Sequence, residues 1–382
     1  MSAATAARAA EPRSEFPIDR RSLIGSAAFG AAALALPGCV TTPRPEVASK
    51  PSLCLPPVNV SPDRVVRTVA GLRPYRDSGF VVRAEQLGPT RLVHNYGHGG
   101  AGVTLSWGSS RLAVDIGLQG HSGPVAVIGS GILGLSTARL VQEAGFPVTI
   151  YAADLPPNTT SNLSGGQWHP FGHFSEGSVT PEWRQQFRSA SDYSWRRFKL
   201  MVGEDYGVRW LPTYTQGGPE EPFIPDFPPV NRALAYDEHP FPIERMTRYD
   251  TLYVEMGRYL RRMMQDIVGA GGNILVRRFV SPSEIAALPE RLVFNCTGLG
   301  ARELFGDQEL RPARGQLAIL PPQAEVRYAF TGRAGYMFSR PDAILLGGSF
   351  ELDEWSTTPN PATISRIVAS HRRLFESLRC TA

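Results

Sequence analysis

Apolar positions along residues 123–154 predict a strand, a glycine-rich turn, a helix and a second strand. The run VAVIG is continuous and β-branched, which is typical of a parallel strand buried on both faces. Leu135, Ala138 and Leu140 then recur at helical spacing and give a helix face that packs back on the sheet. The second strand, FPVTIYAAD, ends at Asp154. This alternation predicts an α/β fold with a parallel sheet.

The turn between this strand and helix carries Gly129, Gly131 and Gly134 in the spacing GxGxxG. In a dinucleotide-binding unit these glycines allow a tight turn, close approach of the backbone to a pyrophosphate, and close helix–strand packing. The helix N-terminus offers free N–H groups to the phosphates. Asp154, twenty residues after Gly134, is placed to accept hydrogen bonds from ribose hydroxyls. A glycine loop used only for packing is the alternative, and the pattern does not separate FAD from NAD.

Composition favours a globular, loop-rich enzyme. The 382 residues include 42% hydrophobic residues, 38 glycines and 33 prolines, which allows one large domain or two intertwined ones. The formal net charge of +4 gives no reason to expect nucleic acid as a partner.

Residues 1–39 are interpreted as an export signal. Arg20 and Arg21 precede the apolar run SLIGSAAFGAAALAL, which is short for a membrane span, and LPGC ends at Cys39. This resembles a twin-arginine signal joined to a lipoprotein cleavage box, although Pro37 departs from the usual box. The pattern favours a periplasmic protein or a membrane-anchored lipoprotein with its lipid on Cys39. An amphipathic or buried N-terminal helix is the alternative.

Residues 40–62 carry six prolines and no apolar periodicity, which predicts an extended tether. The four cysteines follow no metal-site spacing, and no metal is predicted. Cys39 is the candidate lipid site, and Cys296 in the strand-like stretch RLVFNCTG is expected to be an inert core thiol. Cys54 and Cys380 remain, one near each end of the mature chain.

A second glycine-rich stretch, HNYGHGGAGVTLSWG at 94–108, runs directly into the apolar-periodic segment SSRLAVDIG. The stretch raises the question of which backbone needs so much glycine just before a helix. A metal site formed by His94 and His98 is one alternative, but no carboxylate or cysteine nearby completes a ligand set.

Together the motifs resemble the D-amino-acid oxidase family of flavoproteins. The resemblance rests on the GxGxxG unit and on GLRPYR (71–76), HNYGHGGAGVTLSWG (94–108), NTTSNLSGGQWHPFG (158–172), VFNCTGLGARELFG (293–306), LRPARGQL (310–317) and GYMFSRPDAILLGGSFELDEW (335–355). In the family the GLRP and HNYGHGG blocks close the chain, whereas here they precede the GxGxxG strand. The sequence therefore looks like a circular permutant of the family fold.

The resemblance implies a Rossmann-like, doubly wound FAD-binding domain interleaved with a substrate domain built on a mixed or antiparallel sheet. Residues 92–172 and 250–306 would form the FAD-binding domain. Residues 63–91, 173–249 and 307–380 would form the substrate domain. Both domains would thus be assembled from several chain segments.

FAD is the implied cofactor, and the glycine stretch would lie against the flavin ring, where a side chain would block the approach of the backbone. The following helix would point its N-terminus at the flavin pyrimidine oxygen and stabilise the negative charge of the reduced ring. The flavin contacts carried over by match are Gly99, Gly102, Val103, Thr104, Gly129, Gly131, Ile132, Asp154, Thr159, Thr160, Ser161, Gly166, Gln167, Thr297 and Gly298.

The implied reaction is oxidation of a D-amino acid by hydride transfer to the flavin, with dioxygen as the acceptor. The products would be hydrogen peroxide and an imino acid that hydrolyses to a 2-oxo acid and ammonia. Arg73 matches the arginine that grips the substrate carboxylate bidentately, and Tyr336 matches a tyrosine that reaches the same carboxylate. Gly100 matches the position whose carbonyl receives the amine. Trp168 and His169 match positions that line the pocket near the ring, and His169 replaces a commoner glutamine there.

Several alternatives stay open. Arg340, four residues after Tyr336, either faces the pocket and favours acidic D-amino acids or is a solvated rim arginine. Arg73 could instead be a surface arginine in a turn. A related amine or imino-acid oxidase, a quinone-linked dehydrogenase, and a flavin-binding envelope protein without turnover are the alternative functions.

The permutation also concerns the ends of the chain. In the resembled fold the helix ISRIVASHRRLFESL would lead by a short connection into VVRTVAGLRP, so Val65 and Leu378 should lie close together. Cys54 and Cys380 flank these two points, and an oxidising compartment allows a disulfide between them to persist. Two unpaired thiols are the alternative.

Overall fold

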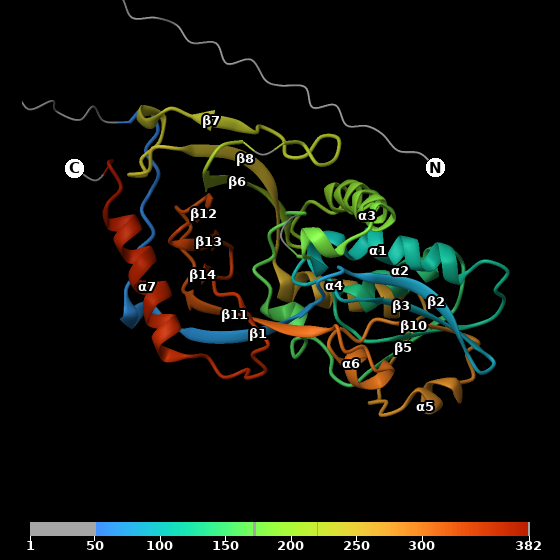
Figure 1. Ribbon diagram of the computed structural model, residues 1–382. Helices are drawn as coiled ribbons and strands as arrows, with labels where there is room; N and C mark the ends of the chain where they lie inside the picture. The colour runs from blue at the N-terminus through green and yellow to red at the C-terminus, as the bar shows by residue number, and fades with distance from the viewer. Residues whose placement is uncertain (1–50, 171–172, 220, 381–382) are drawn as a thin grey trace, which may run out of the picture. The chain divides into compact units, whose positions relative to one another are not determined.

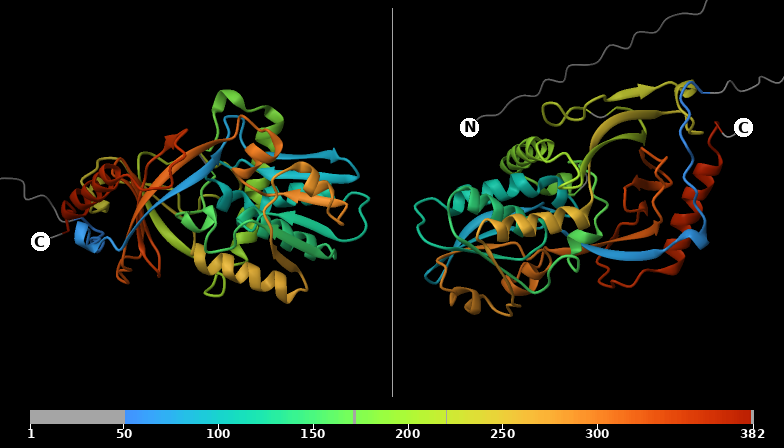
Figure 2. Two further views of the ribbon diagram at one scale, coloured as in Figure 1. Left: turned by 90° about the horizontal axis from the view of Figure 1, so that it is seen from below. Right: turned by 180° about the vertical axis from the view of Figure 1, so that it is seen from behind.

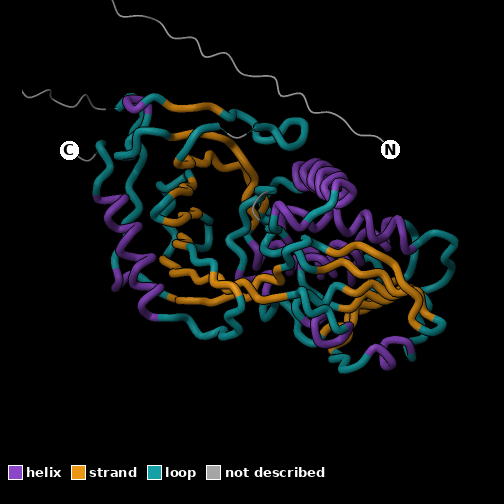
Figure 3. Tube along the Cα trace, in the orientation of Figure 1, coloured by secondary structure: helices purple, strands orange, loops and turns teal. Residues whose placement is uncertain are grey.

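The computed structural model describes residues 51–170, 173–219 and 221–380 (Figure 1). Within the unit Ser49–Ala382 the strands form two sheets, one of six strands and one of nine. Figure 2 and Figure 3 show the two sheets as separate groups of strands, each with its own helices. The predicted export signal at 1–39 and the first part of the predicted tether lie outside the described residues.

The six-stranded sheet confirms the predicted α/β fold. Its order is β2-β3-β10-β4-β5-β9, and every neighbouring pair is parallel except β2 with β3. All four residues of β4 and of β10 are buried, as the continuous apolar runs predict. The strands are β2 (Val81–Leu87), β3 (Thr90–Tyr96), β4 (Val125–Ile128), β5 (Val148–Ala152), β9 (Asn273–Val276) and β10 (Leu292–Asn295).

Helices cover both faces of this sheet. On one face Val125 and Val127 share a hydrophobic cluster with α1, α2, α3 and α4, and α3 packs against α1. On the other face Ala126 and Ile128 pack in a cluster with α5 and α6. Because successive side chains of β4 point to opposite faces of the sheet, this one strand contacts the helices on both faces. The helices are α1 (Gly102–Gly117), α2 (Ile132–Glu143), α3 (Pro181–Lys199), α4 (Met256–Gly269), α5 (Pro282–Ala286) and α6 (Gly300–Phe305).

The nine-stranded sheet is mixed. Its order is β1-β11-β14-β13-β12-β6-β8-β7, with β15 paired to β11, and only β12 with β6 is parallel. Helix α7 (Pro361–Glu376) packs against β11, β13 and β14. The strands are β1 (Arg67–Tyr75), β6 (Val208–Gln216), β7 (Arg232–Leu234), β8 (Met246–Val254), β11 (Arg311–Leu320), β12 (Ala329–Gly332), β13 (Gly335–Ser339), β14 (Ile344–Gly347) and β15 (Glu351–Leu352).

Short 3-10 helices complete the described chain: η1 (Pro62–Arg64), η2 (Thr160–Leu163), η3 (Glu176–Ser178) and η4 (Tyr236–Glu238). None of the described helices is both long enough and apolar enough to cross a membrane.

Three predicted domain boundaries need correction. Strand β2 pairs with β3, so residues 81–91 belong to the six-stranded sheet rather than to the substrate domain. Helix α3 packs on α1, so it also belongs with the six-stranded sheet rather than with the substrate domain. Residues 250–254 complete β8 in the nine-stranded sheet. The edge strand β2 exposes much of its polar sequence, so no apolar periodicity marked it as part of the sheet.

The described part of the predicted extended tether, residues 51–62, packs on the nine-stranded sheet. Val58 and Val60 are buried in the cluster that holds α7 and the nine-stranded sheet. The Tyr328 hydroxyl donates a hydrogen bond to the carbonyl of Pro56 at 2.9 Å. Prolines keep the segment extended, and its apolar side chains then cover the sheet, which their lack of periodicity did not reveal.

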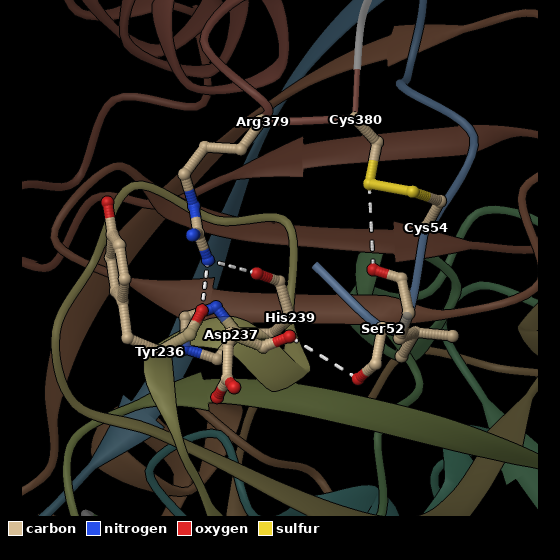
Figure 4. The surroundings of a disulfide bond; sticks show 8 residues. Ser52, Cys54, Tyr236, Asp237, His239, Arg379 and Cys380 are labelled. Atoms are coloured by element: carbon tan, nitrogen blue, oxygen red, sulfur yellow. Dashed lines mark hydrogen bonds between the residues drawn. A yellow bond between two sulfur atoms is a disulfide. The ribbon is translucent and has the colours of Figure 1, made fainter. Parts of the chain in front are cut away.

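Cys54 and Cys380 form a disulfide, with their Cα atoms 5.5 Å apart (Figure 4). Next to it, Arg379 donates hydrogen bonds to the backbone carbonyls of Tyr236 and His239. The predicted pairing is therefore confirmed. Both ends of the described chain are tied to the same edge of the nine-stranded sheet.

Candidate active site

One cavity of about 940 Å³ is lined by residues from both sheets. It includes every predicted catalytic and flavin-contacting position except Gly134 and Arg340. These lining residues are Arg73, Gly99, Gly100, Gly102, Val103, Thr104, Gly129, Gly131, Ile132, Asp154, Thr159, Thr160, Ser161, Gly166, Gln167, His169, Thr297, Gly298 and Tyr336.

The glycine turn after β4 has the close packing that its spacing predicts. A Cβ on Gly129 would lie 2.5 Å from the carbonyl oxygen of Cys296, and one on Gly134 would lie 1.9 Å from the carbonyl of Gly129. Gly134 therefore serves helix–strand packing and stays outside the cavity. Helix α2 begins at Ile132, whose N–H donates a hydrogen bond of 3.0 Å to Oγ of Ser161, and this N-terminus lines the cavity. This arrangement suits a pyrophosphate.

The far end of the cavity suits an adenosine ribose. Asp154 follows β5, is 61% exposed at its side chain, and lies 3.6 Å from the guanidinium of Arg278. Arg277 lies over the ring of Phe279 and lines the same end. Its ion-pair partner is an exposed arginine, and the carboxylate itself stays accessible. It therefore keeps lone pairs that can accept hydrogen bonds from ribose hydroxyls.

The structure answers the question raised by the second glycine stretch. Gly99 and Gly100 have φ angles of 59° and 114°, a region that favours glycine. A Cβ on Gly100 would lie 2.9 Å from Cδ of Arg73, and one on Gly99 would lie 2.6 Å from the carbonyl oxygen of His173. Because these two residues have no Cβ, the backbone can pass between Arg73 on one side and His173 on the other. Helix α1 then begins at Gly102 without a side-chain cap and opens into the cavity.

The two histidines of this stretch do not form a metal site. His98 stacks on Phe80 with ring centroids 5.1 Å apart, and its Nε2 is 2.9 Å from Oγ of Ser109. His94 is fully buried and hydrogen bonds to Asn295. Among the described residues no cluster of three metal-ligating side chains occurs. His94 packs in the core, and His98 is a buried residue of the cavity wall.

Arg73 and Tyr336 come together although 263 positions separate them in the sequence. Arg73 is near the end of β1, pairs with Ala313 across the strands, and donates a hydrogen bond of 3.2 Å to the carbonyl of Ser349. Burial raises the pKa of Tyr336, and the neighbouring Arg73 works against that increase. A guanidinium and a neutral phenol on one wall form a pair of donors for a carboxylate.

Arg340 does not face the cavity, which corrects one of its two expected positions. It follows β13 in the turn Arg340–Ala343, and its guanidinium binds both carboxylate oxygens of Asp342 at 2.7 and 2.8 Å. Trp168 is also absent from the cavity wall, since it is fully buried against Trp195 and Phe227. In both cases a closer partner outside the cavity holds the side chain.

The comparison with protein families shows which family of proteins this cavity belongs to. The chain matches the model of the DAO family, described as FAD dependent oxidoreductase, over residues 18–116 and 124–382. The chain belongs to this family. It is an FAD-dependent oxidoreductase, and FAD is its cofactor.

Curated relatives of this oxidoreductase include two bacterial enzymes. The D-amino-acid oxidase of Rubrobacter xylanophilus is 31% identical over 261 residues, covering 66% of this chain and 77% of the relative. That of Streptomyces coelicolor is 30% identical over 267 residues, covering 65% and 76%. The D-aspartate oxidase of Homo sapiens is 28% identical over 269 residues, covering 66% and 76%.

Solved structures share the fold. The iminodiacetate oxidase from Chelativorans sp. BNC1 aligns with a TM-score of 0.51 at 15% identity, covering 66% of this chain and 79% of that one. The glycine oxidase from Bacillus cereus ATCC 14579 aligns with a TM-score of 0.50 at 14% identity, covering 67% and 80%.

The residues present fit FAD. The cavity is large enough for an extended cofactor, and the N-termini of α1 and α2 both line it. Glycines line the part where the backbone comes closest, and Asp154 lies at the ribose end. The helix N-termini provide backbone donors for the negative charge of the cofactor.

Several oxidoreductase residues at the cavity were missed in the sequence. Gly315 faces Arg73, and a Cβ there would lie 2.3 Å from Nη2 of that arginine. Phe350 stacks near the same guanidinium, 5.8 Å from ring centroid to Cζ. His173 lines the wall next to Gly100. Gly315 and Phe350 lie inside recognised motifs, so the resemblance marked their segments, whereas no pattern marked His173.

Proposed function

We propose that this enzyme oxidises D-amino acids to 2-oxo acids and ammonia and forms hydrogen peroxide. The observation that supports the proposal best is that Arg73, Tyr336 and Gly100 line one cavity, with Arg73 next to both of the others. Curated relatives named D-amino-acid oxidase support the same substrate class.

The residues would bind and orient the substrate. Arg73 would hold the α-carboxylate with two parallel N–H donors, and the hydroxyl of Tyr336 would donate to the same group. The carbonyl of Gly100 would accept an N–H of the neutral amine. These contacts fix the α-hydrogen in one direction, which supplies much of the rate enhancement through orientation. FAD, when bound, accepts the hydride and passes two electrons to dioxygen.

The absorbance of the bound flavin provides the direct test. The purified protein should be yellow, and D-alanine added without air should bleach the oxidised flavin. Readmitted air should restore the colour and release hydrogen peroxide with the 2-oxo acid. Bleaching by glycine or a secondary amine but not by D-amino acids would favour a related amine oxidase. Reoxidation by a quinone but not by air would favour a dehydrogenase, and a flavin that no substrate bleaches would favour a binding protein.

We also propose that the chain is exported and that its order is a circular permutation of the family fold. The segment 1–39 supports export, and so does a disulfide that an oxidising compartment would preserve. The family match divides between residues 116 and 124, where α1 ends and β4 is about to begin. Val65 and Leu378 pack in one hydrophobic cluster, as joined ends of the unpermuted order would.

A further inference from the structure

Helix α7 carries a histidine that reaches the strand of Tyr336. The helix lies along the nine-stranded sheet and packs against β13 (Figure 1). His371, on this helix, is fully buried. Its Nε2 lies 3.1 Å from the carbonyl oxygen of Tyr336, and its Nδ1 lies 2.8 Å from the carbonyl oxygen of Ile367, one turn earlier in α7. The imidazole therefore joins the helix to the backbone of a residue that lines the cavity.

The close approach of this ring depends on Gly335, the residue before Tyr336. A Cβ on Gly335 would lie 2.9 Å from Cε1 of His371 and 2.0 Å from the carbonyl oxygen of Gly347, at the end of β14. The φ angle of Gly335 is 112°, in a region that favours glycine. Glycine thus lets α7, β13 and β14 come together next to the residue that carries the phenol.

The two contacts of the imidazole compete for one proton. Both partners are carbonyl oxygens, which only accept hydrogen bonds. Burial lowers the pKa of His371, so the ring is neutral at neutral pH and has a single N–H. In an α-helix the carbonyl of Ile367 already receives the backbone N–H of the residue four positions later, which is His371 itself. The carbonyl of Tyr336 is therefore the better partner for the ring N–H.

The phenol of Tyr336 has little freedom to turn by itself. Its ring stacks on that of Phe338, with centroids 4.6 Å apart and an angle of 19° between the planes. A Cβ on Gly347 would lie 2.2 Å from Cζ of the tyrosine, and one on Gly348 would lie 2.4 Å from its Cε1. Because these neighbours enclose the ring, the position of its hydroxyl follows the position of the β13 backbone.

Strand β13 separates His371 from the cavity. Met337 packs in the hydrophobic cluster of α7, whereas Tyr336 packs with Phe338 in another cluster, as expected when successive side chains point to opposite faces. His371 does not line the cavity. It can therefore act on a bound substrate only through the strand.

We propose that His371 is a positioning residue, whose Nε2–H donates to the carbonyl of Tyr336 and fixes β13 so that the phenol reaches the substrate carboxylate. The inference rests on the proposed function, because it extends the role given there to Tyr336. It also assigns a task to a buried polar side chain on a helix that contributes nothing else to the site.

The test measures the affinity of the full chain with FAD for butyrate, an unreactive monocarboxylate, from the change in flavin absorbance on titration. His371→Gln places an amide N–H near the position of Nε2 and should bind butyrate within about threefold of the wild type. His371→Asn reaches only as far as Nδ1, and His371→Leu has no donor. Both should bind about tenfold more weakly or worse, the loss expected for a misplaced hydrogen bond to a charged group.

A second background separates positioning from general damage to the fold. In Tyr336→Phe the phenol donor is absent, so adding His371→Leu should weaken butyrate binding further by less than about twofold. Val368→Ala is the matched control, since Val368 is also a buried residue of α7 in the cluster on the nine-stranded sheet. It should lower the urea midpoint of unfolding and leave the butyrate affinity within about twofold of the wild type.

The inference is overturned if His371→Gln loses as much butyrate affinity as His371→Leu. It is also overturned if His371→Leu costs about as much in the Tyr336→Phe background as in the wild type. Neither result depends on turnover. If no D-amino acid reduces the flavin but the butyrate pattern is present, the proposed reaction fails and the positioning role remains. If D-alanine is oxidised and the pattern is absent, the reaction holds and the role of His371 fails.

Discussion

Among single residues, Arg73 has the clearest expected effect. Arg73→Ala should leave the substrate carboxylate unpaired in the cavity and cost roughly 3 to 5 kcal/mol, which is a fall of about 100- to 5,000-fold in kcat/KM. Arg73→Lys should lose part of this, because an ammonium cannot bind bidentately. Both proteins should keep their flavin. The measurement is kcat/KM for D-amino acids together with the flavin absorbance.

The control is Arg340→Ala. Arg340 pairs with Asp342 and does not line the cavity, so its removal should change kcat/KM by less than about threefold. A loss as large as that of Arg73→Ala would show that the position of Arg340 outside the cavity is wrong.

Gly315 supports Arg73 from the neighbouring strand. In Gly315→Ala the new Cβ would lie 2.3 Å from Nη2 of Arg73, so the guanidinium must move away from the carboxylate position. The expected result is a KM for D-amino acids raised by about tenfold or more, since a displaced anchor loses orientation. The flavin content should not change. Gly177→Ala is the control, because nothing lies within 4 Å of a Cβ there; an equal effect in both variants would exclude a specific role for Gly315.

At the scale of elements, helix α7 depends on the cap at its start. The side chain of Asn360 accepts a hydrogen bond of 3.1 Å from the N–H of Thr363, and Pro361 occupies the first turn. Asn360→Ala should lower the free energy of unfolding by about 1 kcal/mol, measured by urea denaturation. Asn360→Asp keeps an acceptor and should lose only a few tenths of that. Equal losses in the two variants would assign the effect to another contact of Asn360.

At the scale of the whole molecule, the disulfide joins positions 326 residues apart. A closure of this length stabilises the folded chain by as much as about 4 to 5 kcal/mol in the loop-entropy account. Replacing both Cys54 and Cys380 by serine should therefore lower Tm by several degrees, and a reducing agent should have the same effect on the wild type. Cys296→Ser alone leaves the disulfide in place. If the double variant melts with the wild type, the link contributes nothing to stability.

The proposed permutation makes a prediction at the same scale. Joining Leu378 to Val65 through a short glycine-rich link and opening the chain between Gly117 and Val125 would restore the family order. Because Val65 and Leu378 share one hydrophobic cluster, the reordered chain should fold and bind FAD. The check is a yellow, monodisperse protein with the wild-type circular dichroism spectrum. A reordered chain that fails to bind flavin at any tested linker length would count against the permutation.

The sequence alone determined the features that depend on neighbouring residues. Continuous apolar runs identified β4 and β5, and the spacing of Gly129, Gly131 and Gly134 identified the turn between strand and helix. These signals are local because strand burial and tight turns restrict residue type within a few positions. The resemblance added Arg73 and Tyr336, which no periodicity marks.

Only the tertiary structure decided which distant segments meet. The polar edge strand β2 joined the six-stranded sheet through backbone pairing, which depends little on side-chain type. Arg340 pairs with Asp342, two residues further along the chain, and does not line the cavity. His173 lies on the cavity wall, although no pattern in the sequence predicts a site there. Charge and burial around a side chain depend on segments hundreds of residues away, so they follow from the fold and not from local sequence.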